Sequence, residues 1–285
     1  MCRFLAYQGQ KVLLADLLYN SENSIISQSR KAKETHQPVN ADGFGLGWYS
    51  QEIEPNPCVI TSILPAWSSS NLRSLSRKIL TDNFFAHVRA ASPGSPVTIQ
   101  NCHPFVSGNL MFMHNGIVWE FPKLRRKFQN ELGDENYEKI VGSTDSEHIF
   151  WLFVNYLKND LNPTKEELIS AMQKTFAKII ELQNQADTEE VPHLNFALTD
   201  GKKLLATKFT SNKSKGPVSL YYALPEKIEI KNKELCLSGN PEKRTGILIA
   251  SEPLSNEKDV WQSVPNNSIF ISDENLNYEI LPIEV

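Results

Sequence analysis

The sequence opens with Met1-Cys2-Arg3-Phe4-Leu5-Ala6-Tyr7, which places a nucleophilic residue beside the chain terminus. Its apolar residues alternate well enough to predict a short strand over residues 2–7. If Met1 is removed, Cys2 carries both a thiol and a free α-amine. An amine with an ordinary pKa of about 7.7–8.0 can take the thiol proton near neutral pH and act as its general base. A buried structural cysteine is the alternative interpretation of this residue taken alone.

The next informative segment is Asn40-Ala41-Asp42-Gly43-Phe44-Gly45-Leu46-Gly47-Trp48-Tyr49. Three glycines at alternate positions predict a tight turn that runs into a strand where backbones approach closely. The segment is not a dinucleotide-binding fingerprint, because that motif needs a strand before its glycines and a helix after them.

Patterns typical of β-strands come before and after a central pair of helices. The leucines of residues 12–19 have helical spacing, and residues 83–89 have the apolar character of a buried strand. Residues 110–120 indicate a hairpin that turns at Asn115-Gly116, because Asn-Gly is the strongest two-residue hairpin signal.

Two helices are predicted at residues 145–157 and 164–183, each with an apolar stripe that can pack against the other. Thr144 with Glu147, and Thr164 with Glu167, have the spacing of capping boxes. Further strands are predicted at residues 194–198, 204–209, 218–223, 245–251 and 268–272. This order favours a layered α+β fold over βαβ repeats.

Composition restricts the class of protein. The 285 residues include 29 Lys and Arg against 33 Asp and Glu, and 40% are apolar, which favours a folded globule and gives no basic footprint for nucleic acid. No apolar run is long enough to span a membrane, and the N-terminus lacks a secretory apolar region. We therefore expect a cytoplasmic protein. Residues 52–57 and 210–217 are only loop-sized linkers, so we expect one domain over residues 2–285.

The four cysteines lie far apart and form no Cys-x-x-Cys pair. They therefore predict neither a disulfide framework nor a zinc site. Cys58, Cys102 and Cys236 are expected to be ordinary thiols, and the chain is expected to need no metal or cofactor.

Four further residues could serve a cysteine nucleophile that acts on an amino acid derivative. An oxyanion needs N–H donors, which Asn115 and Gly116 can supply, although most Asn-Gly pairs only close hairpins. Arg89 could form a two-pronged contact with a carboxylate, or it could be a structural ion-pair partner. Asp145 could receive an ammonium group, or it could belong to the cap of its helix.

The chain resembles the class II glutamine amidotransferases, which are N-terminal-nucleophile hydrolases with a four-layer αββα sandwich. The resemblance rests on motifs in family order, namely Met1-Cys2, residues 40–49, Ala86-His87-Val88-Arg89, Asn101-Cys102-His103-Pro104-Phe105, His114-Asn115-Gly116 and Ser143-Thr144-Asp145-Ser146-Glu147. It implies that Cys2 attacks a γ-glutamyl amide with its own α-amine as base. It also implies an oxyanion hole of Asn115 and Gly116.

The same resemblance implies that Arg89 binds the substrate α-carboxylate and Asp145 the α-ammonium. His103 matches a residue that shapes the pocket. The chain departs from the sugar-forming synthases at Ala90-Ala91-Ser92-Pro93, where those enzymes have Trp-Ala-Thr-His. Ser92 can still hydrogen-bond the substrate, whereas Pro93 supplies no backbone donor.

The opening residues, the glycine-rich segment and the Ile249-Ala250-Ser251-Glu252-Pro253-Leu254 segment resemble the stand-alone branch of the family. That branch includes the γ-glutamyl hydrolase of ergothioneine biosynthesis and the amidotransferase subunit of glutathione breakdown. The strands after residue 193 are expected to complete the sandwich, which leaves no room for a synthase domain. The resemblance thus favours hydrolysis of a γ-glutamyl amide.

The alternative within the family is a glutaminase subunit that supplies ammonia to a separate synthase partner. A homodimer or a partner peptidase subunit is equally compatible with the sequence. Two other readings are weaker. An inactive binding protein would be expected to lose Cys2 first, and a papain-like protease has its cysteine inside the chain.

Overall fold

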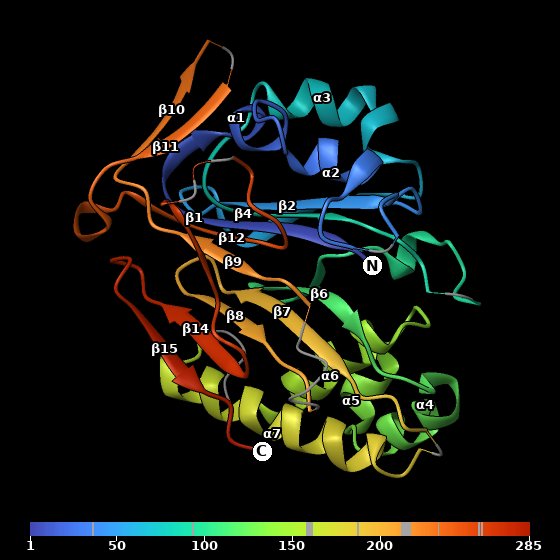
Figure 1. Cartoon of the computed structure of the whole chain (residues 1–285). Helices are drawn as coiled ribbons and strands as arrows, with labels where there is room; N and C mark the ends of the chain where they lie inside the picture. The colour runs from blue at the N-terminus through green and yellow to red at the C-terminus, as the bar shows by residue number, and fades with distance from the viewer. Residues whose placement is uncertain are drawn as a thin grey trace.

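The computed structural model describes residues 1–285 except 36, 93, 158–161, 187, 212–217, 233, 256 and 258. Within these residues, seven strands form one antiparallel sheet in the order β13-β9-β12-β1-β4-β2-β3. Six more form a second sheet in the order β15-β14-β8-β7-β6-β5, and β10 pairs with β11 in a separate ribbon. Figure 1 shows the two sheets stacked face to face with helices on their outer sides.

The strands of the first sheet and the ribbon have the bounds β1 Arg3–Leu13, β2 Phe44–Ser50, β3 Glu54–Ser62, β4 Leu80–Val88, β9 Tyr221–Ala223, β10 Lys227–Lys231, β11 Glu234–Ser238, β12 Gly246–Ala250 and β13 Trp261–Ser263. Those of the second sheet are β5 Phe105–Ser107, β6 Leu110–Ile117, β7 His193–Thr199, β8 Leu204–Lys208, β14 Ser268–Ser272 and β15 Tyr278–Pro282. The α-helices are α1 Leu14–Leu18, α2 Ile25–Lys31, α3 Ser70–Ser76, α4 Phe121–Asn130, α5 Asp134–Glu138, α6 Asp145–Tyr156 and α7 Lys165–Gln183.

Three apolar layers account for this stacking. Helices α1, α2 and α3 pack on one face of the first sheet, and helices α4, α6 and α7 pack on the outer face of the second. The layer between the sheets contains buried side chains from both, including Phe4, Phe85, Met111, Met113, Ala197, Ile249 and Phe270. Alternate residues of each strand thus face opposite apolar layers, as expected for sheets covered on both sides. The predicted α+β class and four-layer αββα sandwich are confirmed.

The predicted hairpin at Asn115-Gly116 is wrong. Strand β6 runs straight through these residues and pairs with β7, with Asn115 opposite Asn195. A Cβ at position 116 would lie 1.9 Å from the His193 carbonyl oxygen, so this glycine permits close strand contact and makes no turn. The chain turns instead at Gly108-Asn109 between β5 and β6, where Gly108 has a φ of 55°.

Two other predictions needed correction at their boundaries. The first strand extends to Leu13, because after a bulge Val12 and Leu13 still pair with β4, and helix α1 is therefore short. The predicted linker at residues 52–57 contains the start of β3. This strand is at the sheet edge and none of its residues is fully buried, so it shows no clear apolar alternation, and its two prolines are tolerated there. Most of the linker predicted at 210–217 lies outside the described residues.

The two capping boxes differ. Thr164 and Glu167 form the complete box at the start of α7. At the start of α6, the Thr144 hydroxyl accepts from the Glu147 amide, but the Glu147 carboxylate accepts from the amides of Val141 and Gly142 instead. The second half of the predicted box is therefore absent at α6.

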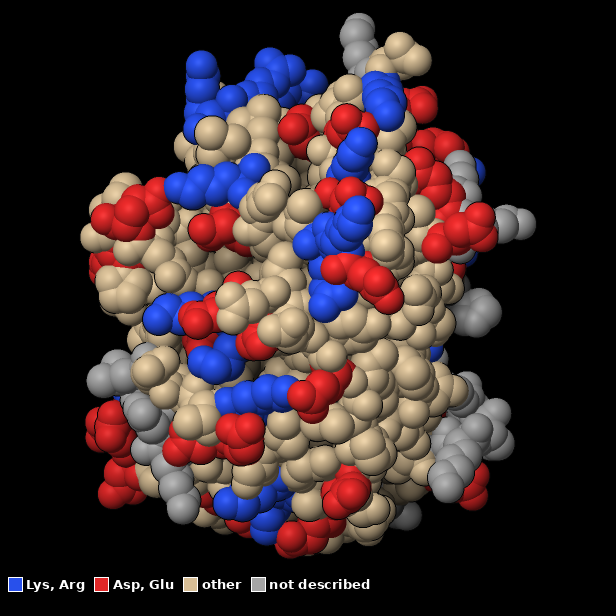
Figure 2. Space-filling model, turned by 90° about the vertical axis from the view of Figure 1, so that its left-hand side faces the viewer, with Lys and Arg blue, Asp and Glu red and all other residues tan. Residues whose placement is uncertain are grey.

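Basic and acidic side chains are interspersed on the face shown in Figure 2, which is the face that carries β10, β11 and β15. This distribution agrees with the small net charge of −4. In the part of the chain that the structure describes, every helix is too short or too polar to cross a bilayer.

Candidate active site

Cys2 directly precedes β1, a strand in the interior of the first sheet, and the N-terminus lies near the boundary between the two sheets (Figure 1). Its side chain lines a cavity of about 1350 Å³. Six of the seven residues that the sequence proposes for the site line this cavity, namely Cys2, Arg89, Ser92, His103, Gly116 and Asp145. The fold therefore brings together residues that are far apart in the sequence.

The thiol of Cys2 contacts the backbone of Ala90. Its sulfur lies 3.5 Å from both the carbonyl oxygen and the amide nitrogen of Ala90, so the thiol can donate and the sulfur can accept. Burial raises the pKa of the Cys2 thiol, while the Ala90 amide and nearby positive charges, including Arg89, oppose that rise. Burial also lowers the pKa of the terminal ammonium on Met1. The thiol therefore needs a base, and an amine at this terminus is easily deprotonated.

Arg89 follows β4, and its side chain is almost completely buried. Its guanidinium donates to Ser95 Oγ at 3.0 Å, to Pro96 O at 3.3 Å and to Asp42 O at 3.5 Å. No carboxylate of the described residues forms an ion pair with it. The guanidinium is thus held by neutral acceptors and keeps its charge available toward the cavity. Asp42 also fixes the following segment, because its carboxylate accepts from the Ala91 amide at 2.8 Å.

Asp145 is the first residue of α6, and its carboxylate is held in a fixed orientation. One oxygen accepts from the Val118 amide at 2.8 Å, and the other accepts from the Ser146 amide at 2.8 Å. Thr144 is the N-cap residue, so the cap does not require the Asp145 side chain. The carboxylate is therefore held in a position where it can receive an ammonium group.

Asn115 and Gly116 lie near the end of β6 in the second sheet. Gly116 lines the cavity, whereas Asn115 is completely buried behind its wall. The Asn115 side-chain amide donates to Ser251 Oγ at 3.3 Å, and its carbonyl oxygen has no hydrogen-bond partner. The amide is therefore already held by a hydroxyl from the opposite sheet.

His103 is buried, and its ring stacks on His87 with ring centroids 4.1 Å apart. Neither ring nitrogen of His103 has a hydrogen-bond partner. Burial lowers the pKa of His103 well below its ordinary value, and it lowers the pKa of His87 to about 3. Both imidazoles are therefore neutral at physiological pH, and His103 forms an uncharged part of the cavity wall.

Ser92 is exposed at the rim of the cavity, and its carbonyl accepts from the Ser95 amide. Pro93, the residue after it, lies outside the described residues. Around the whole site, no three His, Cys, Asp or Glu side chains with described structure are grouped so that they could hold a metal ion.

The sequence profile of the class II glutamine amidotransferases matches residues 11–276. The chain belongs to this family. The profile match begins after Cys2 and does not include it. Family membership identifies the chain as an enzyme of the amidohydrolase type.

Two relatives show how far the similarity extends. The amidotransferase is 36% identical to the probable glutamine amidotransferase DUG3 of Saccharomyces cerevisiae, over 94% of this chain and 81% of the yeast protein. It is 29% identical to the γ-glutamyl-hercynylcysteine sulfoxide hydrolase of Mycobacterium tuberculosis, over 41% of this chain and 50% of that protein.

Solved structures agree on the fold. A glutamine aminotransferase class-II domain protein from Silicibacter pomeroyi superposes with a TM-score of 0.69 over the whole of both chains, at 24% identity. The glutamine phosphoribosylpyrophosphate amidotransferase of Bacillus subtilis superposes with a TM-score of 0.64 at 13% identity. The superposition covers the whole of the present chain and half of the Bacillus chain.

Sequence reasoning missed the role of Arg3 and Glu252 in this amidotransferase. The two side chains are buried, and Arg3 Nε lies 2.9 Å from a Glu252 carboxylate oxygen. The Arg3 guanidinium also donates to the carbonyls of Cys2 and Glu34, each at 3.0 Å. The Glu252 carboxylate accepts from the amides of Lys33 and Glu34, each at 2.9 Å. Glu252 falls in a segment quoted for the resemblance, but a charge pattern alone does not reveal its buried partner.

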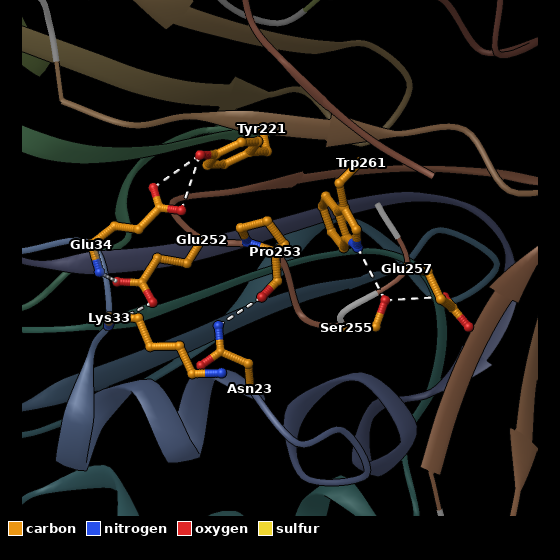
Figure 3. Close-up of a pocket in the computed structure, with 9 residues that line it drawn as sticks. All are labelled: Asn23, Lys33, Glu34, Tyr221, Glu252, Pro253, Ser255, Glu257 and Trp261. Atoms are coloured by element: carbon orange, nitrogen blue, oxygen red, sulfur yellow. Dashed lines mark hydrogen bonds between the residues drawn. The ribbon is translucent and has the colours of Figure 1, made fainter. Parts of the chain in front are cut away.

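Figure 3 shows Glu252 in a second, smaller cavity of about 490 Å³. Lys33 and Glu34 line both cavities, so their segment forms a wall between the two. On the side of the smaller cavity, the Tyr221 hydroxyl donates to the Glu34 carboxylate at 3.0 Å. The buried pair of Arg3 and Glu252 therefore fixes this wall relative to Cys2.

Proposed function

We propose that this amidotransferase hydrolyses a γ-glutamyl amide through a thioester on Cys2, releasing glutamate and an amine. One observation carries the proposal, which is that Cys2, the second residue of the chain, shares a cavity with a buried guanidinium and a fixed carboxylate. The charges of Arg89 and Asp145 complement the carboxylate and the ammonium of an α-amino acid head. With the α-amino acid head bound by these two residues, the γ-carbonyl carbon at the other end of the glutamyl group is the atom that Cys2 would attack.

The proposed reaction begins once Met1 has been removed, so that Cys2 carries the free α-amine. The amine takes the thiol proton, and the sulfur bonds to the amide carbon to give a tetrahedral intermediate. The carbon–nitrogen bond then breaks as the ammonium returns its proton to the leaving amine. Water attacks the resulting thioester with the α-amine again as base, and glutamate and the free thiol are released.

The oxyanion of each tetrahedral intermediate is proposed to be bound by the Gly116 amide and the Asn115 side chain. An amide group has two N–H donors, and Ser251 accepts from the Asn115 amide through one of them. The other can serve the oxyanion when the substrate is bound. Such fixed donors stabilise developing negative charge because they need no reorganisation during the reaction.

His103 and Ser92 are proposed to complete the binding of the glutamyl group. The neutral ring of His103 forms part of the wall and adds no charge that competes with Arg89. Ser92 at the rim can hydrogen-bond the α-carboxylate from the segment that follows Arg89.

The extent of the cavity favours a leaving group larger than ammonia. Besides the residues assigned to the glutamyl group, its lining includes Lys33, Glu34, Thr35, Val218 and Ser219. Glutamine would fill only the part near Arg89 and Asp145. The mycobacterial relative, a γ-glutamyl-hercynylcysteine sulfoxide hydrolase, is named for a substrate with a large leaving group.

A side-by-side glutamate-release assay tests the proposed function. Its substrates are glutamine, γ-glutamylcysteine, glutathione and γ-glutamyl alkylamides of increasing size. We expect at least one of the larger amides to have a higher kcat/KM than glutamine. If only glutamine is hydrolysed, the chain is a glutaminase that can supply ammonia to a separate synthase. If no glutamate is released from any of them, the proposed function is wrong.

Replacing Arg89 with lysine is expected to raise KM by about 10- to 100-fold with a smaller change in kcat. Lysine keeps the positive charge but loses the planar fork that can hold a carboxylate at two points, and a hydrogen bond to a charged group contributes roughly 1.5–3 kcal/mol. Steady-state kinetics with the best γ-glutamyl substrate measure the change. An unaltered KM would reject Arg89 as the carboxylate-binding residue.

A further inference from the structure

Ser251 follows β12 and is completely buried in the layer between the two sheets. Its hydroxyl oxygen accepts two hydrogen bonds. One comes from the Phe4 amide at 3.1 Å, two residues after Cys2, and the other comes from the Asn115 side-chain amide at 3.3 Å. A single oxygen atom therefore joins the strand that carries the nucleophile to the side chain of the proposed oxyanion donor.

This connection matters because the two groups belong to different sheets. Cys2 precedes β1 in the first sheet, whereas Asn115 lies on β6 in the second. Their separation is set by packing between the sheets and by the polar contacts that cross the boundary. The carbonyl oxygen of the Asn115 side chain has no partner, so the bond to Ser251 Oγ is what orients this amide.

The backbone of Ser251 is held independently of its hydroxyl. Its amide donates to the Phe4 carbonyl at 3.1 Å, and its carbonyl accepts from Ser219 Oγ at 2.9 Å. Removing the hydroxyl therefore leaves the path of the chain at residue 251 supported. The consequence of such a change should be confined to the two donors that the hydroxyl serves.

We propose that Ser251 is a positioning residue, which holds the Asn115 amide at the distance from Cys2 that oxyanion binding requires. This inference rests on the proposed function, because it assigns Ser251 a part in the same hydrolysis. Ser251 does not contact the substrate. It acts through Asn115, so its contribution exists only while the Asn115 amide is present.

A double-variant cycle tests this dependence. Removing one oxyanion donor costs about 10²- to 10³-fold in kcat, and Ser251→Ala leaves the donor present but unheld, so we expect kcat to fall by about 10- to 100-fold with little change in KM. In the Asn115→Ala background, Ser251→Ala should cause almost no further loss. Ser251→Thr, which keeps a hydroxyl, should restore most of kcat.

Two further measurements separate positioning from a general structural effect. The rate of Cys2 alkylation by iodoacetamide should be unchanged in Ser251→Ala, because that reaction forms no oxyanion. Ser268→Ala is the matched control. Like Ser251, Ser268 is a buried serine, but its hydroxyl donates to the nearby Pro265 carbonyl and not to a group of the proposed site. It should leave both kcat and alkylation at wild-type values. If Ser251→Ala does not fold, Ser251→Cys replaces it in the cycle with the same expectations.

The inference would be overturned if the fold-losses of kcat in the two single variants multiplied in the double variant. An unchanged kcat in Ser251→Ala would also overturn it. Equal losses of kcat and of Cys2 alkylation would also overturn it, because the hydroxyl would then support the nucleophile strand alone. Failure of the proposed function is recognised separately. In that case the wild-type enzyme itself releases no glutamate from any γ-glutamyl amide, and both proposals are rejected.

Discussion

Replacement of Cys2 with alanine is expected to abolish glutamate release, with a loss of at least about 10⁴-fold in kcat for every γ-glutamyl substrate. The proposed reaction has no other route, because the thioester forms on this sulfur and enzymes that lose a nucleophile retain only weak residual catalysis. The fold should be unaffected, since Cys2 precedes β1 and its sulfur forms, among the described residues, only two long hydrogen bonds of 3.5 Å, both with the Ala90 backbone.

The matched control for this variant is Cys58→Ala. Cys58 is an exposed free thiol on the edge strand β3, remote in sequence from every residue of the site. It should have wild-type kinetics and stability. Circular dichroism and thermal unfolding of both variants would establish that Cys2→Ala is folded. Full activity in folded Cys2→Ala would place the chemistry on another residue.

The same account requires the α-amine of Cys2 to be free. We therefore expect the intact mass of active enzyme to correspond to the chain without Met1. In the structure Met1 itself lines the cavity, so its retention would also obstruct the site. Active enzyme whose mass includes Met1 would contradict the use of the Cys2 amine as the base.

The sequence was a good guide to elements that are buried on a regular period. The helices at α6 and α7 and the strands β4, β7, β8, β12 and β14 were predicted to within a few residues, because each packs an apolar face against a core layer. The edge strand β3 was missed because it begins with exposed polar residues and two prolines and carries no alternation. The ribbon of β10 and β11 was missed although Lys227–Lys231 alternates strictly and Leu235 and Leu237 are buried, because each strand has only five residues.

The candidate site shows a similar division. Motif order was enough to select Cys2, Arg89, Gly116 and Asp145, which all line one cavity. The hairpin at Asn115-Gly116 was wrongly predicted because the Asn-Gly pair is a local turn signal. The pairing partner β7, which approaches Gly116 closely, is distant in the sequence and could not be seen from that signal. Ser251 and Glu252 were not assigned roles, because their importance depends on contacts with residues that are distant in the sequence.

Replacement of Arg3 with methionine is expected to lower the free energy of unfolding by about 3–5 kcal/mol, since breaking a buried ion pair leaves one uncompensated charge in the interior. The charge left behind is the Glu252 carboxylate, which would keep only the amides of Lys33 and Glu34 as donors. Urea unfolding followed by circular dichroism measures the change. Activity should also fall, because the Arg3 guanidinium no longer holds the carbonyl of Cys2.

A second variant separates the buried charge from the lost hydrogen bonds. Arg3→Met combined with Glu252→Leu removes both charges, so it should recover part of the stability that Arg3→Met loses. Recovery should be incomplete, because the amides of Lys33 and Glu34 then lack their acceptor. The exposed pair of Lys231 and Glu229, at 2.9 Å, supplies the matched control, and Lys231→Met should not change the unfolding curve measurably. Equal stability of Arg3→Met and the wild-type chain would show that this ion pair does not hold the nucleophile strand to the wall of the cavity.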